Sequence, residues 1–416
     1  MRVLLLSNIY PTRTTPTGAT FIRSRIRALI DHGVEVVPVA VHPTWTLAAR
    51  LARAPFGRSG NEARPVEPFL TASVRLGPRQ AYRRHLGGQA ARVWLDGITD
   101  AVLTLVLDPV DVVHAHGMYD LPAGLVARSV AERLGVPYVV SMHGTDVNQV
   151  MPRRSGLYGQ VLASACATVY VSAALMDRAH SLVSAHPQAH VIPNGVDPAV
   201  FRPGIRAAVP SVLFVGNLER VKGADRLPAI WREVKAAEPA ARLTIVGTGS
   251  LQSSTRRSLG GDTSVQIMGR LSQVDVAQEM ARAHVLILPS RAEGWPTVIN
   301  EAYATGTPVV GTEVGGVPEA LVEPGCRVPV GPDLERRFAG VVVRVLRSGT
   351  RPRDELVEAA RPYGWSQVTA REIEIYRSCS AGEGTVEAVA RRPVRWQDDG
   401  EREMDARRPH RSDGEA

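Results

Sequence analysis

The feature that most constrains the fold of this chain is a repeated alternation of short apolar runs with helical patterns. The first apolar run spans residues 2–7, and a helical pattern over residues 20–32 is closed by Gly33. A second apolar run follows at residues 34–41. In strand–helix–strand units the helix carries the chain back along the sheet, so the two strands are parallel. We therefore expect an α/β fold built on parallel sheets.

The alternation occurs in two series, which predicts two domains. Further strands are expected at residues 111–116, 138–143, 167–172, 190–192, 211–215, 242–246, 265–269, 284–288 and 307–311. A turn-rich run at residues 193–198 separates the two series, and 416 residues exceed what one core fills. We predict a first domain over residues 1–198, a linker over 199–210, a second domain over 211–365, a final helix over 366–378 and a disordered tail over 379–416.

Composition and charge exclude several classes of protein. The net charge is +8, but 47 of the 49 basic residues are arginines, and no motif that reads nucleic acid accompanies them. No apolar run is long enough to span a membrane, and we expect the first residues to form a strand and not a signal peptide. The three cysteines, Cys166, Cys326 and Cys379, are too few and too scattered for a disulfide framework or a zinc site. We expect a cytoplasmic protein that does not bind nucleic acid.

Residues 42–92 are less regular and contain nine arginines against two glutamates. Aromatic and aliphatic residues are interspersed with these arginines, as on surfaces that meet anionic lipid headgroups. A solvated, arginine-rich excursion explains the same residues equally well. Peripheral contact with the inner face of the membrane is therefore an open alternative, which co-sedimentation with anionic liposomes would test.

The stretch from residue 289 to 319 carries the strongest chemical signal. A loop rich in glycine and proline follows a buried strand, and a helix begins near Thr297. Glu293 therefore lies at the carboxyl end of a strand, where open α/β sheets bind ligands, and Glu301 lies one turn inside the helix. The helix N-terminus between them offers free N–H groups to an anion. This arrangement suits a ligand that has hydroxyl groups at both ends and phosphates between them. A nucleotide sugar has that shape.

Some of the candidate site residues also have simpler explanations when each is taken alone. Glu293 and Glu301 could be a helix cap and a solvated charge, but the coincidence of loop, glycines and helix start disfavours this. His143 lies at a strand's carboxyl end, and Lys222, one of only two lysines, lies in a strand-to-helix loop where a basic residue can neutralise a diphosphate. Gly18 precedes a helix and is explained equally well as an ordinary turn glycine.

These residues resemble the motifs of glycosyltransferase family 4, a retaining family of the GT-B fold. The family's two glutamates with seven residues between them match Glu293 and Glu301. The pattern that follows them matches Glu301-Ala302, Gly306, Pro308-Val309-Val310, Gly311, Gly315-Gly316 and Glu319. Other family motifs match residues 193–197 with Phe201, the pair Lys222-Gly223, and His143. The resemblance covers most of residues 1–378 and is weakest over 42–110. The motifs look most like those of transferases of the teichuronic-acid type.

The resemblance implies two Rossmann-like domains that face each other across a cleft, with the acceptor side in the first domain. It implies the transfer of a hexose-type sugar, with retention, from a nucleotide-sugar donor to a glycan or lipid-linked acceptor in cell-surface polysaccharide or glycolipid synthesis. The final helix is expected to cross back to the first domain. No cofactor and no obligatory metal ion are expected, because no acidic cluster accompanies the phosphate site.

The implied roles at the site fall into three groups. Glu293 and His143 are the catalytic candidates near the donor sugar, Glu301 is expected to bind the ribose hydroxyls, and the backbone by Arg270 to read the base. The residues expected at the diphosphate are Lys222, Arg220, Asn217, Gly18 and Thr297. His114 and His116 are interpreted as structural.

Two departures from the family pattern affect the phosphate site. Asn217 stands where the family has arginine, and we hypothesise that Arg220 supplies the missing charge. The pair Gly18-Ala19 stands where the family has two glycines. A catalytically silent sugar-nucleotide-binding scaffold is one alternative function, to which Asn217 lends some support. A GT-B sugar-nucleotide epimerase is another, but the first domain shows no convincing set of acid–base carboxylates.

Overall fold

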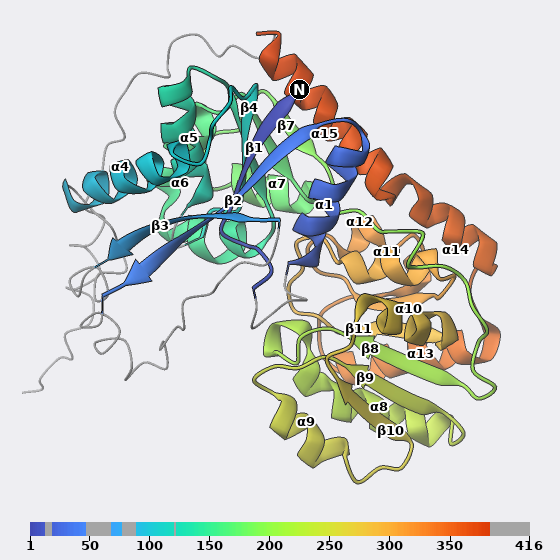
Figure 1. Ribbon diagram of the computed structural model, residues 1–416. Coiled ribbons are helices and arrows are strands. Elements are labelled where there is room, and N and C mark those ends of the chain that lie inside the picture. The colour runs from blue at the N-terminus through green and yellow to red at the C-terminus, as the bar shows by residue number, and fades with distance from the viewer. Residues whose placement is uncertain (13–18, 47–67, 77–88, 120–121, 383–416) are drawn as a thin grey trace, which may run out of the picture.

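The structure, a computed structural model, describes residues 1–12, 19–46, 68–76, 89–119 and 122–382, which form two α/β domains (Figure 1). The first sheet contains, in spatial order, β3 (Leu70–Leu76), β2 (Glu35–Trp45), β1 (Arg2–Ser7), β4 (Val112–His116), β5 (Tyr138–Met142), β6 (Ala167–Tyr170) and β7 (Ala189–Val191). The second contains β10 (Val265–Gly269), β9 (Arg242–Val246), β8 (Ser211–Val215), β11 (Val285–Leu288), β12 (Val309–Thr312) and β13 (Arg327–Val328).

Every strand pairing within these two sheets is parallel. In each sheet the order reverses beside the first strand of the domain, so β1 lies next to β4 and β8 lies next to β11. Both domains are therefore doubly wound, Rossmann-like folds. Loops diverge where the strand order reverses, and ligands bind at the carboxyl ends of the strands there.

Helices cover both sheets. Those of the first domain are α1 (Thr20–Asp31), α4 (Gln89–Leu103), α5 (Ala123–Leu134), α6 (Ser155–Ala163) and α7 (Ala173–His180). Those of the second are α8 (Leu227–Ala237), α9 (Gln252–Leu259), α10 (Gln273–Arg282), α11 (Thr297–Ala304), α12 (Val317–Ala320), α13 (Leu334–Ser348) and α14 (Arg353–Ala360). Because helices cover both faces, the central strands are apolar along their length, as in β1, where Val3 to Leu6 are fully buried.

The chain passes between the domains twice, and the two passages lie side by side. Val196 pairs with Gly364 in a parallel bridge, and the Val196 N–H donates to the Tyr363 carbonyl at 2.8 Å. The last helix, α15 (Trp365–Ser380), then runs back along the first domain beside α1 (Figure 1). A buried ion pair between Arg25 and Glu372 joins these two helices, and both side chains are 1% exposed.

Several sequence-based expectations need correction. The segment 42–92 is more regular than predicted where it is described, because it contains the end of β2, all of β3 and the start of α4. Its remaining residues, which carry most of the arginines of the predicted lipid-facing surface, lie outside the described residues. The predicted tail begins too early, since Cys379 and Ser380 belong to α15, while residues 383–416 lie outside the described part.

The interpretation of the cysteines is wrong for two of the three. Cys166 and Cys379 form a disulfide across a sequence separation of 213 residues. Their distance along the chain gave no hint of pairing, because α15 brings Cys379 back to the first domain. Cys326 is free and buried.

Candidate active site

A cavity of about 540 Å³ lies at the carboxyl ends of β8 and β11. Most of its lining comes from the second domain, and Ala19 and Thr20 at the start of α1 contribute from the first. Six predicted site residues line it: Asn217, Lys222, Arg270, Glu293, Thr297 and Glu301. The parallel topology explains this convergence, because segments from several strand ends meet at the reversal of strand order.

Glu293 lies in the loop after β11 and is only 6% exposed. Its carboxylate accepts from Lys222 Nζ at 2.9 and 2.7 Å and from Ser290 Oγ at 2.6 Å. Lys222 lies on the short turn after β8, and its side chain is 33% exposed toward the cavity side. The lysine therefore holds Glu293 in one orientation while it adds a positive charge to the cavity wall.

Two glycines allow the backbone approaches that this arrangement needs. Gly223 has a φ of +72°, and a Cβ there would lie 2.0 Å from the Pro289 carbonyl oxygen. A Cβ on Gly294 would lie 2.4 Å from the carbonyl oxygen of His143, in the other domain. Glycine at these positions lets the loop after β8 pack on the loop after β11, and lets the Glu293 loop contact the first domain.

Glu301 lies on α11 and lines the cavity behind the helix start. Burial raises the pKa of its carboxyl to about 7. Its side chain is half-buried and faces the cavity, so hydrogen-bond donors from a ligand would stabilise its charged form. Thr297 is the first residue of the same helix, and its N–H donates to the Trp295 carbonyl at 3.0 Å.

His143 lies beside the cavity instead of lining it. Its Nε2 is 3.1 Å from Nδ1 of the fully buried His116, and its ring packs against Phe21. Burial, and to a lesser degree the Arg25 guanidinium, lowers the pKa of His143 well below its ordinary value, so the ring is neutral at pH 7. The Asp146 carboxylate accepts from the N–H groups of His143 and Gly144 and so shapes this loop.

The two histidines interpreted as structural lie in the interior. His114 is bonded through Nδ1 to Tyr376 Oη at 2.6 Å and through Nε2 to Ser141 Oγ at 2.8 Å. His116 also touches His143, which the sequence did not indicate. The three rings form a buried cluster, which contacts α15 through Tyr376.

Two of the residues expected at the phosphates, Arg220 and Gly18, are not among the described residues that line the cavity. The Arg220 side chain is 81% exposed, and its Nε is 4.0 Å from the Asp225 carboxylate. The cavity therefore lends no support to the hypothesis that Arg220 replaces the missing arginine at position 217. Gly18 lies outside the described residues. Its neighbour Ala19 does line the cavity and adopts a left-handed conformation with φ 49°, which L-residues adopt at a cost.

Several cavity residues were not expected from the sequence. Thr248 follows β9 in a Gly-x-Gly turn, and its Oγ1 accepts from Arg270 Nη2 at 3.3 Å. That turn was visible in the sequence, but it lacks the third glycine of a dinucleotide fingerprint. Trp295 lines the cavity and packs on Tyr363 with ring centroids 5.2 Å apart.

The two domains also contact each other through Glu319 on α12. Its carboxylate oxygens accept from the N–H groups of Ala173 and Ala174 at 2.7 and 2.8 Å, at the start of α7. A carboxylate at this end of a helix meets unsatisfied N–H groups and the positive end of the dipole. The contact holds the second domain against the first beside the cavity.

The described residues contain neither a metal-binding cluster nor a membrane-spanning helix. No group of three or more His, Cys, Asp or Glu side chains in the described segments is arranged to hold a metal ion. Within the same segments, every helix is too short or too polar to cross a bilayer.

Two facing Rossmann-like domains, with a cavity at the strand ends of the second, define the GT-B class of glycosyltransferases. The model of Glycosyltransferase Family 4 matches residues 18–200, and that of Glycosyl transferases group 1 matches residues 209–348. The chain is 32% identical to D-inositol 3-phosphate glycosyltransferase 1 of Catenulispora acidiphila, over 65% of this chain and 73% of that one. It is 26% identical to a Bacillus subtilis protein named as a teichuronic acid biosynthesis glycosyltransferase, over 76% of this chain and 82% of that one.

Solved structures with the same fold are more distant in sequence. A sucrose-phosphate synthase from Thermosynechococcus elongatus has a TM-score of 0.67 at 19% identity and covers 92% of this chain and 100% of its own. Anabaena HepE in complex with UDP and glucose has a TM-score of 0.65 at 15% identity and covers 91% of this chain and 100% of its own. The chain belongs to glycosyltransferase family 4 and is a glycosyltransferase.

Proposed function

We propose that this enzyme transfers a hexose-type sugar from a nucleotide-sugar donor to a glycan or lipid-linked acceptor, with retention, in cell-surface polysaccharide or glycolipid synthesis. The observation that carries the proposal is the meeting of Glu293, Glu301 and Lys222 in one cavity at the strand ends of the second domain. The relatives support the substrate class, since their names include a teichuronic acid glycosyltransferase, inositol phosphate glycosyltransferases and a protein bound to UDP and glucose.

In this proposal each side chain has a role that follows from its position. Glu301 accepts hydrogen bonds from the ribose hydroxyls, and Lys222 with the amides at the start of α11 offsets the charge that develops on the leaving diphosphate. Glu293, oriented by Lys222 and Ser290, accepts hydrogen bonds from the donor sugar. Retention through a double displacement would need a carboxylate that attacks the sugar and forms a covalent intermediate. Glu293 already bonds Lys222, so we favour a same-face reaction assisted by the leaving phosphate.

His143 would act from the first domain when the cleft is closed. Its carbonyl packs on Gly294, next to Glu293, so any movement of the domains changes the distance between the histidine and the donor sugar. The proposal uses no metal ion, because Lys222 and the helix N-terminus supply positive potential at the phosphates. Turnover by the purified enzyme should therefore survive treatment with EDTA.

The test has two stages. A thermal-shift panel of UDP-, GDP- and ADP-sugars identifies the donor, since a ligand that binds only the folded state raises the melting temperature. Donor hydrolysis is then compared between the wild type and Glu293→Ala, which should lower kcat by about 100-fold or more. Glu313→Ala is the matched control, because Glu313 is an exposed carboxylate of the same domain outside the cavity.

The outcomes separate the competing functions. Binding of a nucleotide sugar without any turnover would identify a scaffold instead of an enzyme of this mechanism. An unchanged rate in Glu293→Ala with the fold intact would remove Glu293 from the site. Epimerised donor among the products would favour the epimerase alternative.

A further inference from the structure

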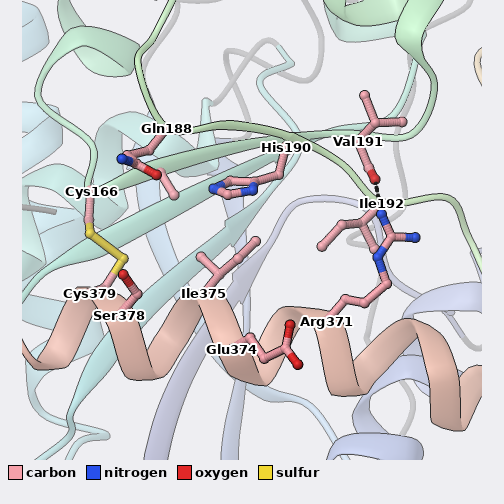
Figure 2. Close-up of a pocket in the computed structure, with 11 residues that line it drawn as sticks. Cys166, Gln188, His190, Val191, Ile192, Arg371, Glu374, Ile375, Ser378 and Cys379 are labelled. Atoms are coloured by element: carbon pink, nitrogen blue, oxygen red, sulfur yellow. Dashed lines mark hydrogen bonds between the residues drawn. A yellow bond between two sulfur atoms is a disulfide. The ribbon is translucent and has the colours of Figure 1, made fainter. Parts of the chain in front are cut away.

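A second pocket, distinct from the donor cavity, lies between α15 and the edge of the first sheet (Figure 2). Its volume is about 310 Å³. One wall is formed by α15, and the other by the segment before β6 together with β7. It shares no lining residue with the donor cavity, so the proposed function leaves it unexplained.

The disulfide between Cys166 and Cys379 lies at one end of this pocket, and Arg371 lies at the other (Figure 2). Cys166 is partly exposed, whereas Cys379 is only 7% exposed. Solvent in the pocket therefore has access to the bond, chiefly from the side of Cys166. A disulfide sealed inside the core would have no such opening.

Five of the eleven residues that line the pocket have polar or charged side chains. Gln188 and His190 line one wall, and Glu374 and Ser378 line the other. Arg371 donates from Nη2 to the Val191 carbonyl and so closes the far end with a charged group. A small polar molecule finds hydrogen-bonding groups of both kinds here, which a large apolar ligand could not use.

The bond is also the last attachment of α15 in the described chain. Earlier in the helix, Glu372 pairs with Arg25 and Tyr376 bonds His114. Beyond Tyr376, Cys379 is the only buried side chain of the described helix. In the described part of this final turn, the disulfide is therefore the attachment made by a buried side chain.

We propose that Cys166 and Cys379 form a thiol–disulfide exchange site, entered by small polar thiols through this pocket, whose redox state determines how firmly the end of α15 is held. The inference does not depend on the proposed function. The accessible disulfide, the polar side chains in the pocket and the absence of another buried anchor beyond Tyr376 in the described helix carry it.

The chemistry balances as two exchange steps. A thiolate of a small dithiol attacks Cys166 Sγ, the bond to Cys379 breaks, and Cys379 leaves as a thiolate that takes up a proton. The second thiol of the reagent then attacks the mixed disulfide and releases Cys166, so one protein disulfide becomes two thiols and the dithiol becomes a cyclic disulfide. A low-molecular-weight disulfide, such as oxidised glutathione, drives the reverse reaction.

The experiment counts thiols on the native full-length chain. The protein is equilibrated with oxidised glutathione, freed of reagent, and treated with or without dithiothreitol before alkylation and peptide mass spectrometry. Oxidised protein should expose one thiol per chain on later denaturation, that of Cys326, and reduced protein should have three. Under native conditions dithiothreitol should open Cys166 and Cys379 to alkylation while the buried Cys326 stays unmodified.

Two further measurements identify the attacked sulfur and the effect on the helix. In Cys379→Ser, oxidised glutathione should form a mixed disulfide at Cys166 and leave Cys326 free. Reduction of the wild type should accelerate amide hydrogen exchange at residues 378–382 more than in the rest of α15. Failure of the pair to oxidise, resistance of the bond to native reduction, or unchanged exchange at the end of the helix would each overturn the proposal.

Discussion

Donor affinity should depend on pH through Glu301, whose carboxyl lines the cavity on α11. Burial raises its pKa from an ordinary 4.5 to about 7. A ribose diol donates best to an ionised carboxylate, which has free lone pairs and no proton of its own. With a pKa of about 7, about one-tenth of the carboxyl is ionised at about pH 6 and about nine-tenths at about pH 8. The donor dissociation constant should therefore fall about tenfold over this range.

Isothermal titration of the best donor from the thermal-shift panel, at about pH 6, 7 and 8, measures the effect. Glu301→Gln is the control, because it keeps the shape of the side chain and cannot ionise. The variant should bind the donor more weakly than the wild type at about pH 8 and show a flat profile. A flat wild-type profile, or the same slope in both proteins, would refute the role of Glu301.

The same shift has a consequence for the ligand-free protein. Between pH 4.5 and about 7, the folded state holds the Glu301 proton more tightly than the unfolded chain does. The contribution of this group to the free energy of unfolding is therefore fully present below pH 4.5 and is lost as the pH rises toward 7, by at most about 3 kcal/mol. Glu301→Gln should remove that slope from thermal melts.

Two other predictions concern the contacts that hold the domains and α15 in place. Glu372→Gln leaves the buried Arg25 without its ionic partner, so it should lower the free energy of unfolding by about 3–5 kcal/mol in a denaturant or thermal melt. The double variant Arg25→Met with Glu372→Met should recover most of that loss. Equal melting of the wild type and both variants would contradict this. Glu319→Ala removes the acceptor of two N–H groups at the start of α7. At about 1–2 kcal/mol, this loss should lower the ratio of domain-closed to domain-open molecules about 5- to 30-fold. Small-angle scattering should then show a larger radius of gyration. An unchanged radius together with unchanged kinetics would show that the Glu319 contact does not hold the domains together.

Much of the fold follows from local pattern. The apolar runs of β1, β8 and β11 predict buried parallel strands, because helices must cover both faces of a sheet built from such units. The helix α4 was missed although Trp94, Ile98 and Val102, which lie four residues apart, are all buried. That period was visible, but the surrounding arginines obscured it.

Local sequence pattern also predicted part of the candidate site. Glu293, Thr297 and Glu301 share one loop and helix, so their spacing along the chain determines their spacing in space. Asn217 and Lys222 reach the same cavity because β8 and β11 are neighbours in the sheet, a strand order that the alternation of strands and helices did not predict.

By itself the sequence determined the fold class, the family resemblance and the loop and helix that carry Glu293, Thr297 and Glu301, since these depend on periodicity and on short-range spacing. Only the tertiary structure decided that Lys222 pairs with Glu293, that Arg220 points to solvent and that His143 stacks on His116. It alone joined Cys166 to Cys379 across 213 residues. The contacts of Lys222, His143 and Cys166 join segments that are distant along the chain, and the packing of the two sheets and the return of α15 determine which segments meet.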